Sequence, residues 1–261
     1  MSLPPVILLH GCGGSPQQAF GQTGWLAAFE GTERDVRALQ LPGHGRDNPS
    51  HEPSAYADLA GLLVGDLPEE ACDIVGFSLG AKLALDVAVR FPERVRRMVL
   101  GGIGDNAFAP EAIGEAAART LEYGADENTP PPVRAFLATW NPALNDALAI
   151  AAVLRRTPNP VFVEADIAAI HAPVALVNGE ADFVAHMGTR LIDALGVEQV
   201  LLPGVGHFDL TAQAEFRDIA IEFLAADRPA NRDGKETSRE TCQLSCRRRR
   251  PHRGCERRRT R

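Results

Sequence analysis

The sequence has few cysteines, few aromatic residues and no long hydrophobic run. Only 2 of its 5 cysteines, Cys12 and Cys72, lie before residue 227, which is too few for a disulfide framework and fits a reducing compartment. No stretch approaches the roughly 18 apolar residues of a membrane helix, and the N-terminal segment lacks the basic region of a secretory signal. We therefore expect a cytoplasmic protein with no membrane segment.

Basic residues are scarce in residues 1–226, which hold 14 Lys and Arg against 29 Asp and Glu. This acidic balance argues against nucleic acid as the ligand of that part. Residues 227–261 hold 13 Lys and Arg against 5 Asp and Glu, and almost no large apolar residue. They are therefore expected to form a disordered basic tail, a solvated extension with no selected role. Its arginine runs leave contact with nucleic acid or anionic surfaces open for the tail alone.

The tail also holds four residues of ligand chemistry, Cys242, Cys246, His252 and Cys255. Their spacing matches no zinc pattern, so we expect no metal site there.

Short apolar runs that end in glycine or another turn residue recur along the acidic part of the chain. They are near-continuous rather than alternating, as in strands that are buried on both faces of a sheet. Patterns typical of helices lie between most of them, including a 3.6-residue repeat over 79–91 that stops at Pro92. The alternation predicts an α/β fold with a doubly wound, mostly parallel sheet of about six strands. The expected strands cover residues 5–9, 36–41, 74–77, 95–100, 174–177 and 200–202, and further helices are expected at 54–63, 184–195 and 211–225.

One long interval, residues 105–171, interrupts this alternation. Its proline-rich turns and alanine-rich pieces predict a helical cap rather than a structureless loop. The expected organisation is a core of residues 1–104 and 172–226, a cap at 105–171 and the tail at 227–261. Apolar cap residues could line an acyl pocket or pack against one another, and the sequence leaves both readings open. These residues are Phe108, Leu121, Tyr123, Phe136, Leu137, Trp140 and Leu148.

The segment Gly-Phe-Ser-Leu-Gly, residues 76–80, joins an expected strand to an expected helix. By itself it leaves open whether Ser78 is a nucleophile or a turn residue. Glycines at 76 and 80 permit a sharp turn that exposes the hydroxyl at the strand's carboxyl end, where the helix also points its positive end. A serine hydroxyl is a poor nucleophile at neutral pH. Acyl transfer therefore needs a base, a group that orients the base, and donors for the developing oxyanion.

Candidates for each of these roles follow other expected strands. Asp182 comes directly after the fifth strand, and His207 lies in a glycine-rich loop after the sixth. Because parallel strands end at one edge of a sheet, we expect Ser78, Asp182 and His207 to meet there. The glycine-rich loop after the first strand lets backbone amides approach a ligand, so the amides of Cys12 and Leu79 are the expected oxyanion donors.

Together the segments HGCGGS, LPGHGRD, GFSLG, NGEAD and GVGHF resemble the α/β-hydrolase superfamily over roughly residues 4–226. This resemblance implies a Ser-His-Asp triad, an oxyanion hole at the two positions just named, and no metal or organic cofactor. Most members carry two antiparallel strands before this first strand; we expect a sheet without them, with Val36–Leu41 at its edge. Asp105, after the fourth strand, lies where some members place the acid. We favour Asp182, because its position at a strand end is the commoner one in the superfamily.

We interpret these residues as a serine hydrolase that cleaves a carboxylic ester, or a related acyl bond, of a small molecule through an acyl-enzyme. The same triad leaves carbon–carbon bond hydrolysis, thioester hydrolysis and cofactor-free perhydrolysis open. Dehalogenases and epoxide hydrolases of this fold are excluded, because they carry an Asp nucleophile where this chain has Ser78. The alternative from another class is a non-catalytic protein that binds a small molecule in the same pocket. His10 and His44, in glycine-bounded loops, are expected to be structural.

Overall fold

The computed structural model describes residues 3–226, apart from 110–112, 158, 160, 186 and 187. The predicted tail at 227–261 lies outside the described residues, and so do the expectations of disorder, metal ligands and anionic contacts that concern it. Within the described residues, no helix combines the length and the apolarity that crossing a membrane requires.

Six strands of the described chain form one sheet, in the order β2-β1-β3-β4-β5-β6. Every neighbouring pair is parallel. The predicted parallel sheet is therefore confirmed, with Val36–Leu39 at an edge as expected. The strands are β1 (Val6–Leu9), β2 (Val36–Leu39), β3 (Cys72–Phe77), β4 (Val95–Gly101), β5 (Val174–Gly179) and β6 (Gln199–Leu202).

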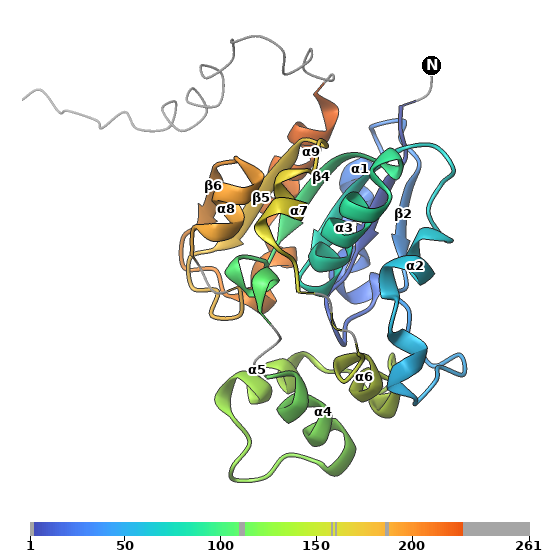
Figure 1. Cartoon of the computed structure of the whole chain (residues 1–261), viewed down its shortest axis with the longest axis vertical. Helices are drawn as coiled ribbons and strands as arrows, with labels where there is room; N and C mark the ends of the chain where they lie inside the picture. The colour runs from blue at the N-terminus through green and yellow to red at the C-terminus, as the bar shows by residue number, and fades with distance from the viewer. Residues whose placement is uncertain (1–2, 110–112, 158, 160, 186–187, 227–261) are drawn as a thin grey trace, which may run out of the picture. The chain divides into compact units, whose positions relative to one another are not determined.

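Helices cover both faces of this sheet. Successive strand residues point to opposite sides, and because both sides are apolar, each is buried under helices. Ile7 and Leu9 of β1 pack into one apolar cluster with helices of the first face, whereas Val6 and Leu8 pack into a second cluster on the other face. The fold is therefore doubly wound (Figure 1). The first face carries α2 (Leu59–Val64), α3 (Leu79–Arg90), α7 (Glu164–Ala168) and α8 (Arg190–Leu195), and the second carries α1 (Trp25–Phe29) and α9 (Ala214–Ala225).

Some expected helices are shorter than their patterns indicated. The helix expected at 54–63 is split into a 3-10 turn (Pro53–Tyr56) and α2, because Asp58 leaves helical geometry and its carboxylate caps the amide of Gly61 at 2.8 Å. In the interval 184–195, where a helix was expected, α8 covers Arg190–Leu195, and residues 186 and 187 lie outside the described residues. Further short helices are η1 (Gln17–Gly21), η3 (Pro92–Arg94), η4 (Asp105–Phe108) and η5 (His207–Ala212).

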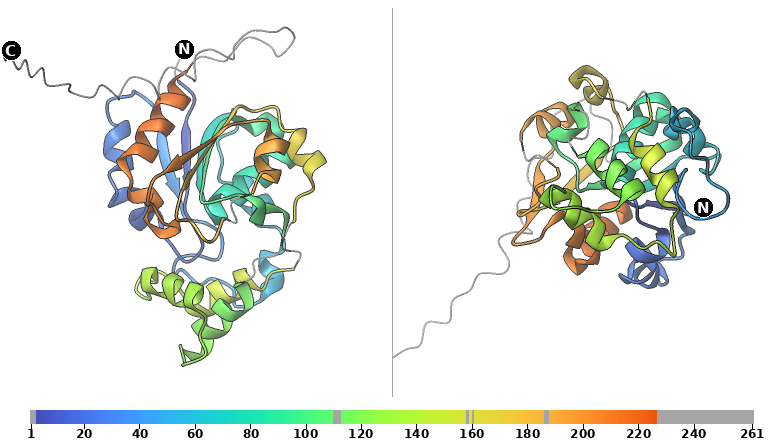
Figure 2. Two further views of the ribbon diagram at one scale, coloured as in Figure 1. Left: turned by 90° about the vertical axis from the view of Figure 1, so that its left-hand side faces the viewer. Right: turned by 90° about the horizontal axis from the view of Figure 1, so that it is seen from below.

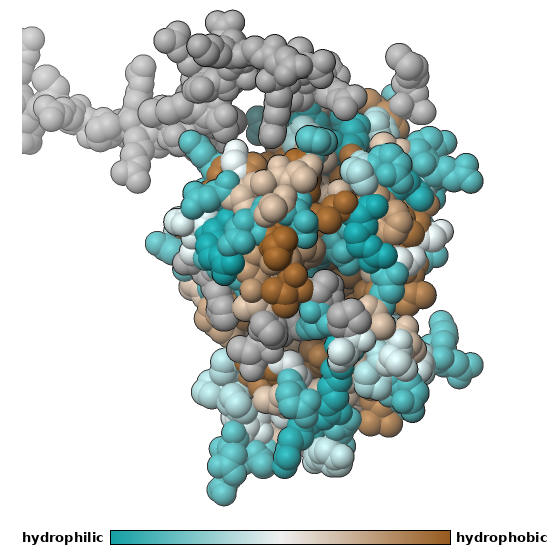
Figure 3. Space-filling model, viewed as in Figure 1, coloured by the Kyte–Doolittle hydropathy of each residue, from teal (hydrophilic) through white to brown (hydrophobic). Residues whose placement is uncertain are grey.

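Three helices between β4 and β5 stand off the sheet (Figure 2): α4 (Gly114–Tyr123), α5 (Pro131–Thr139) and α6 (Ala147–Leu154). They share an apolar centre of Ala117, Val133, Phe136 and Ile150, and their outer surface is mostly hydrophilic in Figure 3. The division into a core and a cap at 105–171 stays a prediction. Within that interval η4 and α7 pack against α8, so we use the word cap below for residues 113–155 only.

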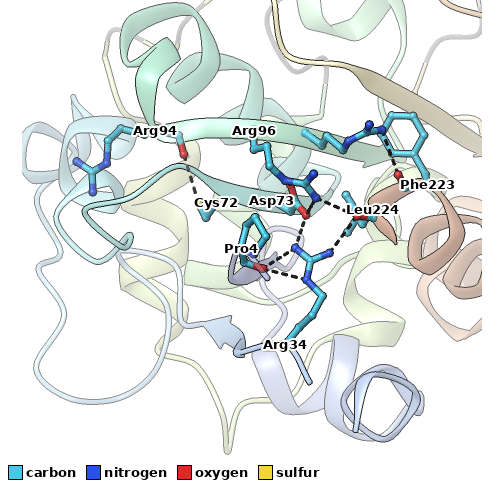
Figure 4. A network of polar contacts seen from close by, with 9 residues as sticks. Pro4, Arg34, Cys72, Asp73, Arg94, Arg96, Phe223 and Leu224 are labelled. Atoms are coloured by element: carbon cyan, nitrogen blue, oxygen red, sulfur yellow. Dashed lines mark hydrogen bonds and ion pairs between the residues drawn. The ribbon is translucent and has the colours of Figure 1, made fainter. Parts of the chain in front are cut away.

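A buried ion network joins the sheet to the last helix (Figure 4). Asp73 of β3 is fully buried and pairs with the guanidinium groups of Arg34 and Arg96. Both arginines also donate to the Leu224 carbonyl, at 3.1 and 2.9 Å, near the end of α9. Arg34 further donates to the Pro4 carbonyl at 2.9 Å. The network therefore connects the chain before β1, the amino ends of the central strands β3 and β4, and the end of α9.

Candidate active site

Ser78 occupies a strained turn between β3 and α3. Its backbone has φ 55° and ψ −114°, a region that non-glycine residues rarely adopt. The turn is so tight that neither Gly76 nor Gly80 could carry a side chain. A Cβ at Gly76 would lie 2.6 Å from the Gly80 carbonyl oxygen, and one at Gly80 would lie 2.2 Å from the Leu9 oxygen. The two glycines of the segment are therefore required by close approach of backbones, as the sequence predicted.

His207 lies at the start of η5, after β6, and its imidazole is buried. Its Nδ1 is 2.8 Å from Asp182 Oδ2, and its Nε2 is 3.0 Å from Ser78 Oγ. An ionised carboxylate can only accept a hydrogen bond, so Nδ1 carries the proton and Nε2 is left to accept from the serine hydroxyl. The three predicted residues thus meet at the carboxyl ends of β3, β5 and β6.

Asp182 is held on both oxygens. Oδ1 accepts from the amides of Val184 and Ala185 at 2.8 and 2.9 Å, while Oδ2 accepts from His207. Burial alone would raise the pKa of this carboxyl. The hydrogen bond from His207 and its electrostatic attraction for the carboxylate, together with the two amides, outweigh burial and hold the pKa of Asp182 below its usual value. The carboxylate is therefore ionised and fixed in place at neutral pH.

Asp105, the alternative acid, has a different partner. Its Oδ1 accepts from the amide of Leu191 at 3.1 Å, in the first turn of α8. A Cβ at Gly188 would lie 1.8 Å from its Oδ2, so the carboxylate is packed against the chain that leads into α8. Asp105 therefore binds a helix terminus, and the carboxylate that contacts His207 is that of Asp182.

The two amides expected to bind an oxyanion lie beside Ser78. Leu79 is the first residue of α3, so its amide has no partner within the helix, while the next amide, of Gly80, donates to the His10 carbonyl at 3.1 Å. Cys12 lies at the apex of a turn that the Gly14 amide closes by donating to the Gly11 carbonyl at 3.1 Å. Both Cys12 and Leu79 line the same cavity as Ser78 and His207.

His10 and His44 fix the loops around this turn. His10 Nδ1 donates to the Gly11 carbonyl at 2.8 Å and its Nε2 accepts from the Leu41 amide at 3.2 Å. His44 Nε2 accepts from the Gly13 amide at 3.0 Å. Burial, with a smaller effect of His44, lowers the pKa of His10 to about 3, and burial lowers the pKa of His44 to about 4. Both imidazoles are therefore neutral at pH 7 and bind backbone, in agreement with the structural role expected for them.

Residues 6–219 match the model of the alpha/beta hydrolase family. The chain belongs to this family. A pimeloyl-[acyl-carrier protein] methyl ester esterase of Aromatoleum aromaticum is 33% identical over 229 residues, which cover 74% of this chain and 88% of that protein. A 2-hydroxymuconate semialdehyde hydrolase of Pseudomonas putida is 37% identical over 102 residues, which cover 38% of this chain and 37% of that protein. The superfamily expected from the sequence is confirmed.

The fold is shared with solved structures. The enol-lactonase from Burkholderia xenovorans LB400 superposes with a TM-score of 0.68 at 19% identity, covering 87% of this chain and 93% of that one. At this identity the likeness concerns the fold, and it agrees with the sheet described above.

In this α/β hydrolase, a cavity of about 210 Å³ lies between the strand ends and the cap. Its floor includes Ser78, His207, Phe77 and Phe208, and its wall is mostly apolar. The cap contributes Ile113, Gly114, Ala117, Phe136, Thr139 and Leu154 to the wall, and Arg156 follows them.

Most of the apolar residues proposed from the sequence within 105–171 do not line this cavity; of the seven, only Phe136 is in its described lining. Tyr123 and Leu148 are 81% and 45% exposed, and Phe108 packs under the guanidinium of Arg190 at 4.5 Å. The remaining three, Leu121, Leu137 and Trp140, pack inside the cap. For these three residues, packing within the cap is therefore the correct alternative, and lining the pocket is not. The sequence left both open because apolar composition does not determine the direction of a side chain.

Two residues next to the site were given no role from the sequence. Phe208 follows His207, and its ring meets the imidazole edge-on at a centroid distance of 5.1 Å. Asn145, in the cap, hydrogen-bonds the turn that carries Cys12. Phe208 belongs to the segment GVGHF, but that segment was used only to place His207, and no motif marks Asn145, so the contacts in the folded chain reveal the surroundings of both.

Proposed function

We propose that this protein is a serine hydrolase that cleaves small carboxylic esters through an acyl-enzyme. The observation that carries the proposal is the continuous hydrogen-bonded series from Ser78 through His207 to Asp182, which ends on a serine in a strained turn that lines the cavity. The relative from Aromatoleum aromaticum is named as a methyl ester esterase, which supports this chemistry.

In the first half-reaction His207 Nε2 takes the proton of Ser78 Oγ as this oxygen attacks the ester carbonyl carbon. The carbonyl π electrons move to its oxygen, and the amides of Cys12 and Leu79 bind that oxyanion. When the intermediate collapses, the bond to the alcohol oxygen breaks, and His207 gives its proton to the leaving alcohol. Asp182 keeps the imidazole in the required tautomer and stabilises the imidazolium.

The second half-reaction repeats these steps with water. His207 removes a proton from water, the resulting oxygen attacks the acyl carbon, and Ser78 Oγ leaves with the proton from His207. The carboxylic acid is released and the resting hydrogen bonds are restored. Every proton and electron pair is accounted for by the three side chains, the ester and water, so the cycle requires no organic cofactor.

The cavity favours short, apolar acyl groups. At about 210 Å³ it is smaller than the roughly 300–1,000 Å³ that pockets for drug-sized ligands occupy. The ring of Phe136 and the side chain of Leu154 limit it on the cap side. We therefore expect kcat/KM for p-nitrophenyl esters to be highest for short acyl chains and to fall as the chain lengthens.

Labelling by a fluorophosphonate, together with turnover of the p-nitrophenyl ester series, tests the proposal. The intact protein should label and hydrolyse esters, and S78A should do neither. S54A is the matched control, because Ser54 is exposed in the turn before α2, and it should behave as the intact protein does. Failure of the intact protein to label or to hydrolyse esters would instead favour a protein that binds a small molecule without reacting with it, and equal turnover by S78A would show that Ser78 is not the nucleophile.

Carbon–carbon bond hydrolysis is the second candidate, favoured by the similarity to the 2-hydroxymuconate semialdehyde hydrolase over part of the chain. The same triad would serve it, since a ketone carbonyl replaces the ester carbonyl. Assaying a 2-hydroxy-6-oxodienoate beside the ester series separates the two. A kcat/KM for the dienoate above that of every ester would assign the protein to that reaction, and the thioester and perhydrolysis alternatives can be compared in the same way.

A further inference from the structure

Asn145 is a buried polar residue of the cap whose side chain binds the core. It lies between α5 and α6 and is 1% exposed, although asparagine is mostly a surface residue. Its Nδ2 donates to the carbonyls of Gly13 and Gly14 at 2.9 and 3.0 Å, and its Oδ1 accepts from the Gly45 amide at 2.8 Å. Both amide hydrogens and the amide oxygen therefore contact backbone that is about a hundred residues or more away in sequence.

The turn that Asn145 binds is the one with Cys12 at its apex. Gly13, the third residue of this turn, has φ 70°, the conformation that a type II turn requires at that position. On its other side the turn is held by His44, which accepts from the Gly13 amide at 3.0 Å. The ring of Phe136 lies against it as well, since a Cβ at Gly13 would be 2.8 Å from that ring.

Other contacts attach this end of the cap to the core. The Asp146 amide donates to the Gly45 carbonyl at 3.1 Å, and Arg46 donates to the Pro142 carbonyl at 2.7 Å. The cap would therefore remain attached without the Asn145 side chain. What that side chain adds is a direct bond from the cap to the turn beside Ser78.

We propose that Asn145 is a positioning residue for the oxyanion hole, through which the cap fixes the location of the Cys12 amide. The inference rests on the proposed serine hydrolase function. An oxyanion donor acts only within a narrow range, about 2.7–3.1 Å from the oxygen on which charge develops. Two hydrogen bonds to consecutive carbonyls of a four-residue turn set its tilt, and a small tilt moves the amide at its apex out of that range.

Two variants test this role. N145L keeps the branched shape and the number of heavy atoms and removes all three hydrogen bonds, whereas N145D keeps an acceptor for Gly45 but places a carboxylate oxygen against two carbonyl oxygens. We expect kcat, measured per fluorophosphonate-titrated Ser78, to fall about ten- to a hundredfold in both, less than the roughly 10² to 10³ for loss of a donor. KM should stay close to that of the intact protein. The affinity for a trifluoromethyl ketone, whose adduct places an oxyanion in the hole, should fall in parallel with kcat, while the affinity for the matching methyl ketone is unchanged.

N141D is the matched control, because Asn141 lies in the same loop but its side chain caps only the local Ala143 amide at 3.0 Å. It should keep both kcat and ketone affinity. Unchanged kcat in N145L and N145D, a rise in KM alone, or loss of the melting transition in both would overturn the positioning role. An intact protein that neither labels nor hydrolyses any substrate would instead refute the proposed function itself, so the two failures are distinguishable.

Discussion

At the scale of single residues, the surroundings of two carboxylates separate their roles. Asp182 contacts an imidazole and two amides of its own loop, whereas Asp105 contacts the start of α8. Both follow a strand of the same sheet, and both were candidates for the acid. The side-chain hydrogen bond to His207 is the property that distinguishes them, and it leads to a pair of matched substitutions.

We expect D182N to lower kcat about 10³- to 10⁴-fold, because an amide cannot hold the imidazole in the tautomer that accepts the Ser78 proton. D105N should instead lower the melting temperature, since it weakens a bond at the start of α8, and should leave kcat near that of the intact protein. Ester turnover and thermal melts of both variants check this. A large loss of kcat in D105N with little loss in D182N would transfer the role of the acid.

The buried histidines give the protein a pH-dependent stability. The folded-state pKa values of His10 and His44, about 3 and about 4, lie below the usual value of 6.5. The unfolded chain therefore binds protons below about pH 6.5 that the folded chain cannot bind. The free energy of unfolding is highest above that pH, and each histidine lowers it by about 1.4 kcal/mol per pH unit until its folded-state pKa is reached.

H44N should flatten the fall in the free energy of unfolding between about pH 6 and pH 4 by about 1.4 kcal/mol per unit, since one of the two neutral histidines is gone. Urea unfolding across this range is the measurement. S54A serves as the control, because Ser54 is exposed and carries no group that titrates in this range, and it should keep the slope of the intact protein. An identical slope in H44N would mean that His44 is protonated in the folded state.

At the scale of elements, α3 lies unusually close to the end of β1. The backbone of Gly80 in its first turn approaches the Leu9 carbonyl so closely that no side chain fits between them. This approach places the start of α3, with the amide of Leu79, beside the turn that carries Cys12. Packing of one helix against one strand thus brings the two expected oxyanion donors together.

G80A should therefore unfold the site. The added methyl would lie 2.2 Å from a backbone oxygen that cannot move away as a side chain can, so we expect a loss of about 1–3 kcal/mol or more in the free energy of unfolding, together with loss of activity. G65A is the control, because Gly65 ends α2 in helical geometry and its nearest neighbour to a new Cβ is 3.6 Å away. Thermal melts should show G65A unchanged or slightly stabilised. Normal melting of G80A would contradict the close approach.

At the scale of the whole molecule, two separate groups of buried charged residues lie at opposite ends of the strands. The site lies at the carboxyl ends of the strands, and the buried network of Asp73, Arg34 and Arg96 lies at their amino ends (Figure 4). This network joins β3, β4 and the end of α9. Because it is far from Ser78 along the sheet, its contribution should be to stability and not to the chemical step.

D73N leaves the buried guanidinium of Arg34 and the partly exposed one of Arg96 without their anion, and we expect it to cost about 3–5 kcal/mol in the free energy of unfolding. Below the melting transition, kcat should be unchanged. D35N is the matched control, since Asp35 pairs with Arg37 on the surface, where both side chains are about half exposed and such a pair contributes little to stability. Denaturant unfolding measures the stability of both variants, and ester turnover without denaturant measures their kcat. A loss of kcat in folded D73N would show that the network also affects the active site.

The local pattern of the sequence determined the family, the strands and the order of the expected catalytic residues. Short apolar runs bounded by glycine specify buried strands, alternation with helical repeats specifies a parallel sheet, and the order of Ser78, Asp182 and His207 after three strands brings them to one edge. Each inference needs only a few neighbouring residues and the geometry of a parallel sheet. The family and the six-stranded fold therefore followed from the sequence.

The tertiary structure decided what depends on side-chain direction and on contacts between distant segments. In the folded chain, Asp182 contacts His207, whereas Asp105 contacts the start of α8. The side chains of Tyr123 and Leu148 are exposed, while that of Phe136 lines the cavity. Asn145 hydrogen-bonds a turn more than a hundred residues earlier in the sequence. The sequence ranks such residues by type alone. Which of them contact one another is fixed only when helices pack on the sheet, because packing sets the direction of each side chain.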